Sequence, residues 1–227
     1  MATSLDLEEQ EQLETLKHFW NTYGNLITAI VTVAAVAFLA WTGWQYYARK
    51  QAAQASALYN EMEYSVRAGN VERTERVLAD MKEHYARTAY AQQAGLLAAK
   101  LLEEKGKSDA ARAALGWVAE KANDTGYRAI ARLRLSAVLL DAKAYDQALA
   151  QLAGEFPREF EPLVADRKGD IYMAQGKRDS ARDEYQKAWN GLGSESEYRR
   201  LVEIKLNAAG VAVQNPKAPP APAPNNS

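Results

Sequence analysis

A run of 30 residues without a charged side chain or histidine, from Phe19 to Ala48, dominates the pattern of hydrophobic and polar positions. Its centre, residues 26–39, reads LITAIVTVAAVAFL, and aromatic residues flank it on both sides. A helix of this length reaches about 45 Å, more than the roughly 30 Å hydrocarbon core of a bilayer. Aromatic rings favour the interfaces beside that core. The pattern predicts a transmembrane helix over residues 21–48, surrounded by lipid, after an amphipathic leader at residues 1–20.

Three other structures fit this run less well. A buried core helix is usually shorter and keeps a polar stripe. A cleavable signal peptide begins with basic residues, whereas residues 1–48 carry five acidic residues and one basic residue. A helix that lies in the membrane interface needs a charged face, which this run lacks.

Beyond residue 48 the apolar positions recur at helical spacing, and no stretch alternates like a strand. Turn signals separate helices that we expect to hold about 12–18 residues each. The turns at Gly69, Gly106, Lys143 and Gly176 follow one another at intervals of 37, 37 and 33 residues. Two helices in each such period predict a helical solenoid, with a generic helical bundle as the alternative. The predicted fold is therefore all-α: a single transmembrane helix, then a tetratricopeptide-like domain over residues 49–210.

The last repeat carries the most complete tetratricopeptide pattern of small, aromatic and turn residues: Gly169, Tyr172, Gly176, Ala181, Tyr185 and Ala188. We expect Gly169 and Ala181 to be small so that two helices can approach, and the tyrosines to fill the gaps between helices. Earlier repeats match with substitutions at Ala99, Leu102, Ala111, Leu115, Val118, Ser136, Leu139, Ala148 and Leu152. The first pair, residues 52–85, keeps only an apolar face, formed by Leu58, Met62, Val77, Leu78 and Met81.

Several helix ends can also be predicted. Ser108, Asp146 and Asp179 stand where N-caps are expected, and Ser194 with Glu197 has the spacing of a capping box. Residues 195–209 predict a closing helix whose apolar side holds Tyr198, Leu201, Val202, Ile204 and Leu206. Residues 211–227 hold five of the seven prolines, which predicts an extended, disordered tail.

Charge and cysteine content exclude several classes of function. The net charge is −1, and residues 49–227 carry 27 basic and 24 acidic residues, too mild an excess to indicate nucleic-acid binding. The chain has no cysteine, so it forms no disulfide, thiolate metal site or cysteine nucleophile.

No catalytic motif emerges from the sequence. His18 and His84 lack a metal-ligand partner at the next helical turn, and the adjacent acids of Glu103-Glu104 and Asp183-Glu184 diverge around a helix. We therefore expect a protein that is not an enzyme, with no catalytic, cofactor-binding or metal-binding residues and no cofactor. A protein-binding surface is expected instead. Its candidate exposed aromatic residues, none of which the sequence assigns to binding, are Tyr64, Tyr90, Trp117 and Tyr127.

Two segments resemble the YfgM-like family of ancillary SecYEG translocon subunits. One is EQLETLKHFWNTYG at residues 11–24, and the other is the stretch over residues 165–182. The resemblance implies a single-pass protein of the cell inner membrane, with a cytoplasmic N-terminus and a periplasmic domain. It also implies association with SecYEG and with the periplasmic chaperone PpiD, and transfer of emerging, unfolded client polypeptides to chaperones.

Two questions stay open at this point. Lys17 precedes the apolar run while Arg49 and Lys50 follow it, a bias that weakly favours a cytoplasmic domain and opposes the orientation implied by the resemblance. Tetratricopeptide domains also assemble many other complexes, so a scaffold for envelope or cell-division machinery is the alternative function.

Overall fold

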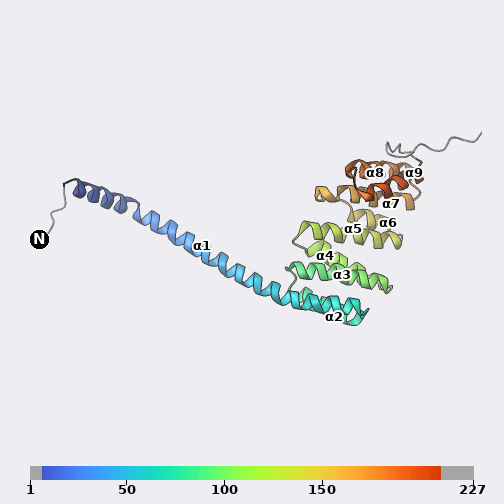
Figure 1. Cartoon of the computed structure of the whole chain (residues 1–227), viewed down its shortest axis with the longest axis horizontal. Helices are drawn as coiled ribbons and strands as arrows, with labels where there is room; N and C mark the ends of the chain where they lie inside the picture. The colour runs from blue at the N-terminus through green and yellow to red at the C-terminus, as the bar shows by residue number, and fades with distance from the viewer. Residues whose placement is uncertain (1–6, 211–227) are drawn as a thin grey trace, which may run out of the picture. The chain divides into compact units, whose positions relative to one another are not determined.

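The computed structural model describes residues 7–210 and divides the chain into two compact units, residues 1–53 and residues 54–227. Every regular element in the described range is helical, which confirms the predicted all-α class (Figure 1). The helices are α1 (Leu7–Arg67), α2 (Val71–His84), α3 (Ala89–Glu104), α4 (Ser108–Lys121), α5 (Thr125–Asp141), α6 (Tyr145–Gln151), the short 3-10 helix η1 (Arg158–Phe160), α7 (Glu161–Ala174), α8 (Arg178–Gly191) and α9 (Glu197–Ala208).

The described part of the first unit consists of α1 up to Ala53, which includes the end of the leader and the long apolar run. Its most apolar 18-residue window has a mean hydropathy of 2.1, and none of that window is buried against other residues of the chain. Val33 and Leu39, for example, keep 69% and 68% of their surface exposed. Backbone groups in this part are bonded within the helix, and the Thr32 hydroxyl donates to the carbonyl oxygen of Thr28. This is the one helix in the described range long and apolar enough to cross a membrane.

The predicted segment limits at residues 20 and 48 do not coincide with helix ends. Helix α1 continues without a break through both positions to Arg67, and the first compact unit ends at Ala53. The first residues of the leader and the predicted tail at residues 211–227 lie outside the described residues. The leader from Leu7 onward is thus part of the same helix as the apolar run.

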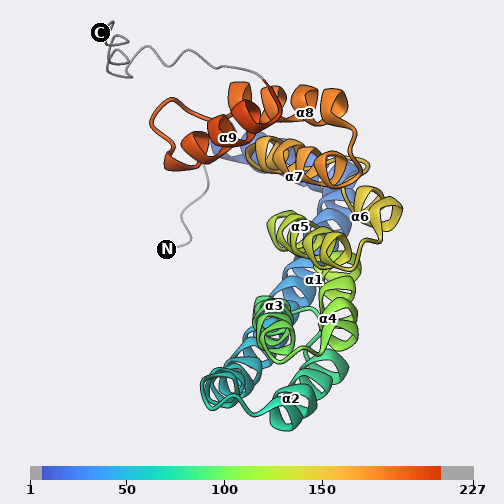
Figure 2. The same cartoon turned by 90° about the vertical axis from the view of Figure 1, so that its right-hand side faces the viewer.

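The second unit is a stack of helix pairs, in which residues 54–67 of α1 pair with α2, α3 with α4, α5 with α6 and α7 with α8 (Figure 2). Each pair turns at the residue that the sequence period marks. Gly69, Gly106, Lys143 and Gly176 all have positive φ angles, between 58° and 75°. At each turn the backbone N–H groups of the turn residue and its successor donate back to the preceding helix, which satisfies its last carbonyl oxygens. Lys143 holds this left-handed conformation without being glycine.

The predicted N-caps at Ser108, Asp146 and Asp179 are wrong, as is the capping box at Ser194. Helices α4, α6 and α8 begin directly after Lys107, Ala144 and Lys177, the residues that follow the left-handed turn residue. The turn is so short that the predicted caps fall inside the first helical turn. Side-chain caps occur in other helices, at Asn70, Thr88 and Asp124. Ser196 rather than Ser194 precedes α9, and it makes no side-chain cap bond.

The predicted small residues are buried between the paired helices. Ala99, Ala111, Ser136, Ala148 and Ala181 are each at most 1% exposed. Gly169 of α7 lies against the ring of Tyr185 of α8, so that a Cβ atom added there would come closer than 3.0 Å to ring carbons. Tyr185 is 3% exposed and fixed by its neighbours. The glycine is therefore required by the aromatic ring that it faces.

Replacing Gly169 by alanine should lower the free energy of unfolding by about 1–3 kcal/mol, because the added methyl group overpacks the contact with Tyr185. Gly116 of α4 is the matched control, since an added Cβ there meets no atom within 4 Å. Gly116→Ala should stabilise the helix by about 0.5–1 kcal/mol. Urea unfolding of the full-length protein in detergent, followed by tryptophan fluorescence, measures both. Equal stability of Gly169→Ala and wild type would contradict the contact.

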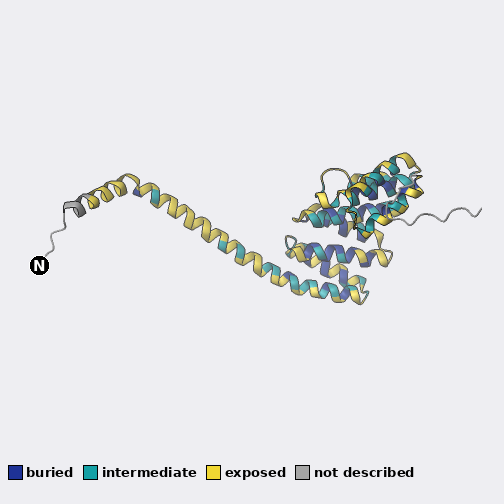
Figure 3. Ribbon diagram, turned by 45° about the horizontal axis from the view of Figure 1, so that its top comes forward, coloured by how far each residue is buried: buried dark blue, intermediate teal, exposed yellow. Residues whose placement is uncertain are grey.

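Two apolar clusters form the interior of the second unit (Figure 3). The larger includes Met62, Val77, Leu115, Leu139 and Ile171 and extends from the first pair to α7, which confirms the apolar face predicted for residues 52–85. The smaller joins α7 and α8 to α9 through residues that include Tyr185, Val202 and Leu206. Helix α6, which contributes Ala148 to the larger cluster, has only seven residues, fewer than predicted, and is followed by a loop to α7.

The predicted apolar side of the closing helix is only half correct. Val202 and Leu206 are fully buried, but Leu201 and Ile204 are 44% and 61% exposed. Helix α9 is the last helix described, and α8 is the helix that it contacts most. One face of α9 therefore packs on the stack, and the other face has no neighbouring helix within residues 7–210.

Candidate functional site

The loop between α6 and α7 is held in place by one arginine of α5. The Arg132 side chain donates from Nε to the carbonyl oxygen of Gln151 (2.8 Å), from Nη1 to that of Glu155 (3.2 Å) and from Nη2 to that of Ala153. The guanidinium carbon lies 4.0 Å from the centre of the Phe156 ring. These contacts hold the loop in place although it has no strand or α-helix. The loop can therefore form one wall of a pocket.

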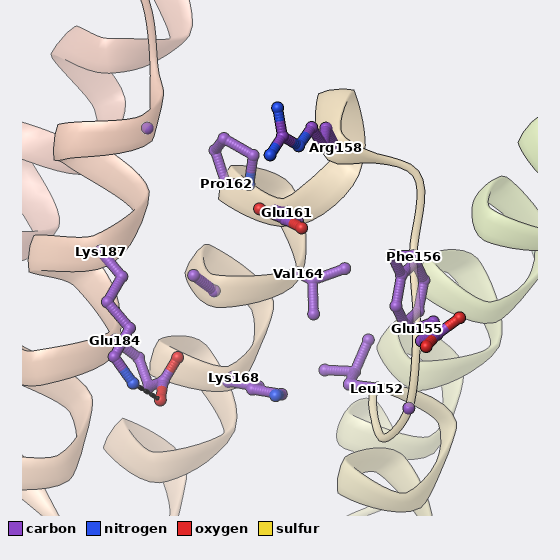
Figure 4. A pocket seen from close by; sticks show the side chains of 13 residues that line it. Leu152, Glu155, Phe156, Arg158, Glu161, Pro162, Val164, Lys168, Glu184 and Lys187 are labelled. Carbon is purple, nitrogen blue, oxygen red and sulfur yellow. Dashed lines mark hydrogen bonds and ion pairs between the residues drawn. The ribbon is translucent and has the colours of Figure 1, made fainter.

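A pocket of about 850 Å³ lies on one side of this loop, between it, α7 and α8 (Figure 4). Leu152, Phe156 and Val164 provide apolar side chains, and Glu184 and Lys187 of α8 face them, joined by an ion pair of 2.6 Å. The residues that line it are Leu152, Gly154, Glu155, Phe156, Arg158, Glu161, Pro162, Val164, Ala165, Lys168, Glu184, Lys187 and Gly191.

The chemistry of this pocket suits recognition of a polypeptide. Its lining combines apolar side chains with three acidic and three basic side chains. Such an arrangement accepts apolar side chains while polar groups fix their orientation. Within residues 7–210 no group of three or more His, Asp or Glu residues is placed to hold a metal ion.

The histidines and carboxylate pairs considered from the sequence lie at ordinary positions. His84 ends α2 with its ring against Tyr85, at 6.2 Å between ring centres. Glu184 pairs with Lys187, whereas Asp183 beside it makes no ion pair with any described residue. Burial raises the pKa of Glu103, with Asp141 adding to the effect.

The candidate aromatic residues divide into two groups. Tyr64 and Tyr90 are exposed, with 61% and 36% of their surface accessible. Trp117 and Tyr127 are half-buried and pack against the larger apolar cluster. Tyr90 also stacks beside Tyr59, with 5.8 Å between ring centres.

Comparison of the repeats shows that two of these aromatic residues share a repeat position with Phe160, a register that sequence reasoning missed. Tyr90, Tyr127 and Phe160 each precede the left-handed turn residue of their repeat by 16 positions. The Tyr127 hydroxyl accepts a hydrogen bond from Gln93 of the preceding repeat. The signal was available, because aligning the chain on the turn residues brings these three rings into register.

A second feature missed from the sequence is a buried polar cluster that joins α9 to α7. Asp166, 1% exposed, accepts hydrogen bonds from Lys205 Nζ (2.7 and 2.9 Å) and from the Tyr198 hydroxyl (2.6 Å). Lys205 also donates to Asp170 (2.9 Å), which accepts from the Tyr185 hydroxyl (2.9 Å). Burial and the neighbouring aspartates raise the pKa of both tyrosines. Every member has a partner, so this cluster is a structural joint.

Comparison with known proteins covers nearly the whole chain. The sequence profile of the tetratricopeptide repeat-like domain matches residues 17–211. Three similar proteins are each called "Ancillary SecYEG translocon subunit". The chain is 34% identical to the one from Neisseria gonorrhoeae over 203 residues, which is 89% of this chain and 97% of the relative. Its identity to the one from Haemophilus influenzae is 30% over 88% of this chain and 97% of the relative. Its identity to the one from Escherichia coli is 25% over 88% of this chain and 95% of the relative.

These matches include the apolar helix as well as the helix pairs, since the profile begins at residue 17. They confirm the resemblance found in the leader and in the last repeat. The chain therefore belongs to the YfgM-like family of proteins with a tetratricopeptide repeat-like domain.

Proposed function

We propose that this protein is an ancillary subunit of the SecYEG translocon that works as an anchored, non-catalytic scaffold. Its helical domain binds partner and client polypeptides, and α1 holds that domain beside the translocon. The observation that carries the proposal is the match to relatives named for this role over 88–89% of the chain, anchor and domain together. The exposed apolar surface of α1 supports it, because such a surface is stable only in lipid or against another protein.

The finer parts of the proposal follow the family resemblance. The leader at residues 1–20 is cytoplasmic, residues 21–48 cross the inner membrane, and the domain at residues 49–210 lies in the periplasm. There it passes emerging polypeptides to chaperones such as PpiD. The pocket beside α7 supports polypeptide binding, since its lining combines apolar side chains with charges of both signs.

Photo-cross-linking from the anchor tests the association. A photoreactive amino acid replaces Leu26, Val33 or Leu39, all exposed on α1, in the full-length protein in cells. We expect covalent products with translocon subunits. The same amino acid at the exposed Arg76 of α2 is the control, because it reports neighbours of the domain instead. Products with cell-division or envelope-assembly proteins, and none with the translocon, would favour the alternative scaffold function.

A reporter enzyme active only in the periplasm, fused to the C-terminus, tests the orientation. We expect high activity from this fusion and low activity from a matched reporter that works only in the cytoplasm. The reverse result would place the domain in the cytoplasm and contradict the periplasmic part of the proposal.

A further inference from the structure

A second pocket, of about 500 Å³, lies on the other side of the loop that Arg132 holds. Helix α5 provides Thr125, Arg128, Ala129 and Arg132, α4 provides Ala119, and the loop provides Glu155, Phe156 and Pro157. Phe156 and Glu155 border both pockets, so a segment of the loop separates them. We call this second space the arginine pocket.

The two arginines of this pocket form no ion pair with a described residue, as is also true of exposed arginines such as Arg76, but here two such charges line one pocket. Arg128 and Arg132 stand one helical turn apart on the same face of α5, a spacing at which like charges repel. Neither has a carboxylate oxygen within 4 Å among the residues described, although arginines elsewhere in the domain, such as Arg73 with Glu61, do form such pairs. Burial lowers the pKa of Arg132, and Arg128 adds to the effect. The pocket thus holds two neighbouring positive charges that the fold does not neutralise.

Hydrogen-bond donors also remain unused in the pocket. A guanidinium group has five N–H donors in a planar fork. Arg132 uses three of them on the loop carbonyl groups, and the side chain of Arg128 makes no hydrogen bond within residues 7–210. Glu155 is the one acid that lines the pocket, and it is exposed and makes no ion pair there. Two guanidinium groups with free donors are suited to bind a carboxylate.

We propose that the arginine pocket binds an acidic side chain of a polypeptide held by this domain. The carboxylate lies between Arg128 and Arg132, and an apolar neighbour in the bound chain packs on Phe156 and Pro157. Because both pockets share Phe156, a chain that crosses the loop reaches the larger pocket as well. This subsite rests on the proposed function of polypeptide binding and adds a preference for segments in which acidic and apolar residues alternate.

Fluorescence anisotropy with the full-length protein in lipid nanodiscs tests the subsite. The probes are labelled, end-capped peptides of glycine and serine with a central Leu-Glu-Leu or Leu-Gln-Leu. We expect the glutamate peptide to bind at least tenfold more tightly than the glutamine peptide, and the difference to shrink as salt is added. Arg128→Gln should remove the difference. Arg76→Gln, at an exposed arginine of α2, is the matched control and should preserve it. Arg132 is left intact because it holds the loop.

Three results would overturn the subsite. They are equal binding of the two peptides by the wild type, absence of binding by the glutamate peptide, and a full preference in Arg128→Gln. A glutamine peptide with a free C-terminal carboxylate distinguishes a chain end from a side chain, and tighter binding of that peptide than of the glutamate peptide would also overturn the proposal. Tight, equal binding of the two capped peptides would contradict the subsite but still support polypeptide binding by the domain. Failure of the anchor to cross-link to the translocon would instead count against the proposed function and leave the subsite unaffected.

Discussion

Replacing Lys205 by methionine should lower the free energy of unfolding by about 3–5 kcal/mol, the cost of leaving a buried charge without its partner. Lys205 donates to both Asp166 and Asp170, and Asp166 has only 1% of its surface exposed. Methionine keeps much of the side-chain volume but removes the positive charge. Asp166 would then retain the hydrogen bond that it accepts from the Tyr198 hydroxyl. Urea unfolding of the full-length protein in detergent measures the change.

Lys187→Met is the matched control for this prediction. Lys187 also pairs with a carboxylate, at 2.6 Å, but its side chain is 65% exposed. Glu184 is only 15% exposed, but Lys187 reaches into solvent, so the loss of this pair should cost clearly less than the loss of Lys205. Adding Asp166→Asn to Lys205→Met should recover part of the stability, because it removes the uncompensated charge. Equal effects of the two lysine substitutions would show that the α7–α9 joint contributes little.

Replacing Val33 by arginine should impair membrane insertion by roughly 2.5–3.5 kcal/mol, the cost of an arginine at the centre of a spanning helix. Val33 lies in the middle of the apolar run and is 69% exposed on α1, so no other described residue covers most of its surface. Membrane fractionation with alkaline extraction measures the fraction inserted. We expect a clear shift of this variant out of the membrane pellet.

Two variants control for side effects of the substitution. Val33→Leu keeps the apolar character, and Ala53→Arg places the same charge at the last residue of the first unit. Both should fractionate like the wild type. Normal fractionation of Val33→Arg would show that residues 21–48 are not the spanning segment.

The helix pairs were predictable because their signals are local. A left-handed turn residue affects only the few residues around it, and a charge-free run needs no partner to be recognised. The period of the turns therefore located Gly69, Gly106, Lys143 and Gly176 correctly. The caps were predicted at the wrong residues, because the residue that donates back to the preceding helix at each turn also lies directly before the next helix, as Lys107 does. Only the turn geometry shows that no position remains for Ser108 to cap.

The candidate sites depended on contacts that periodicity does not encode. Helical spacing tells which residues share a face, but not which side chain meets that face. From the sequence, Arg132 is expected to be an ordinary solvated charge, but in the structure it holds a loop about 20 residues later in the sequence. From the sequence, Asp166 and Asp170 are expected on a solvated helix face. In the structure α9 places Lys205 against both of them. The exposure of Leu201 and Ile204 likewise depends on the absence of a further described helix beside α9.

The repeated turn has a consequence for the order in which the domain is made. Each turn closes through backbone bonds between residues at most five positions apart, such as Asn70 to Ser65 and Lys177 to Tyr172. A helix pair can thus form as soon as its own residues have been synthesised, and the pairs can fold one after another from the N-terminal side. The joint at Asp166 differs, since Lys205 lies 39 residues further along the chain. Completion of the last pair therefore waits until α9 has been synthesised.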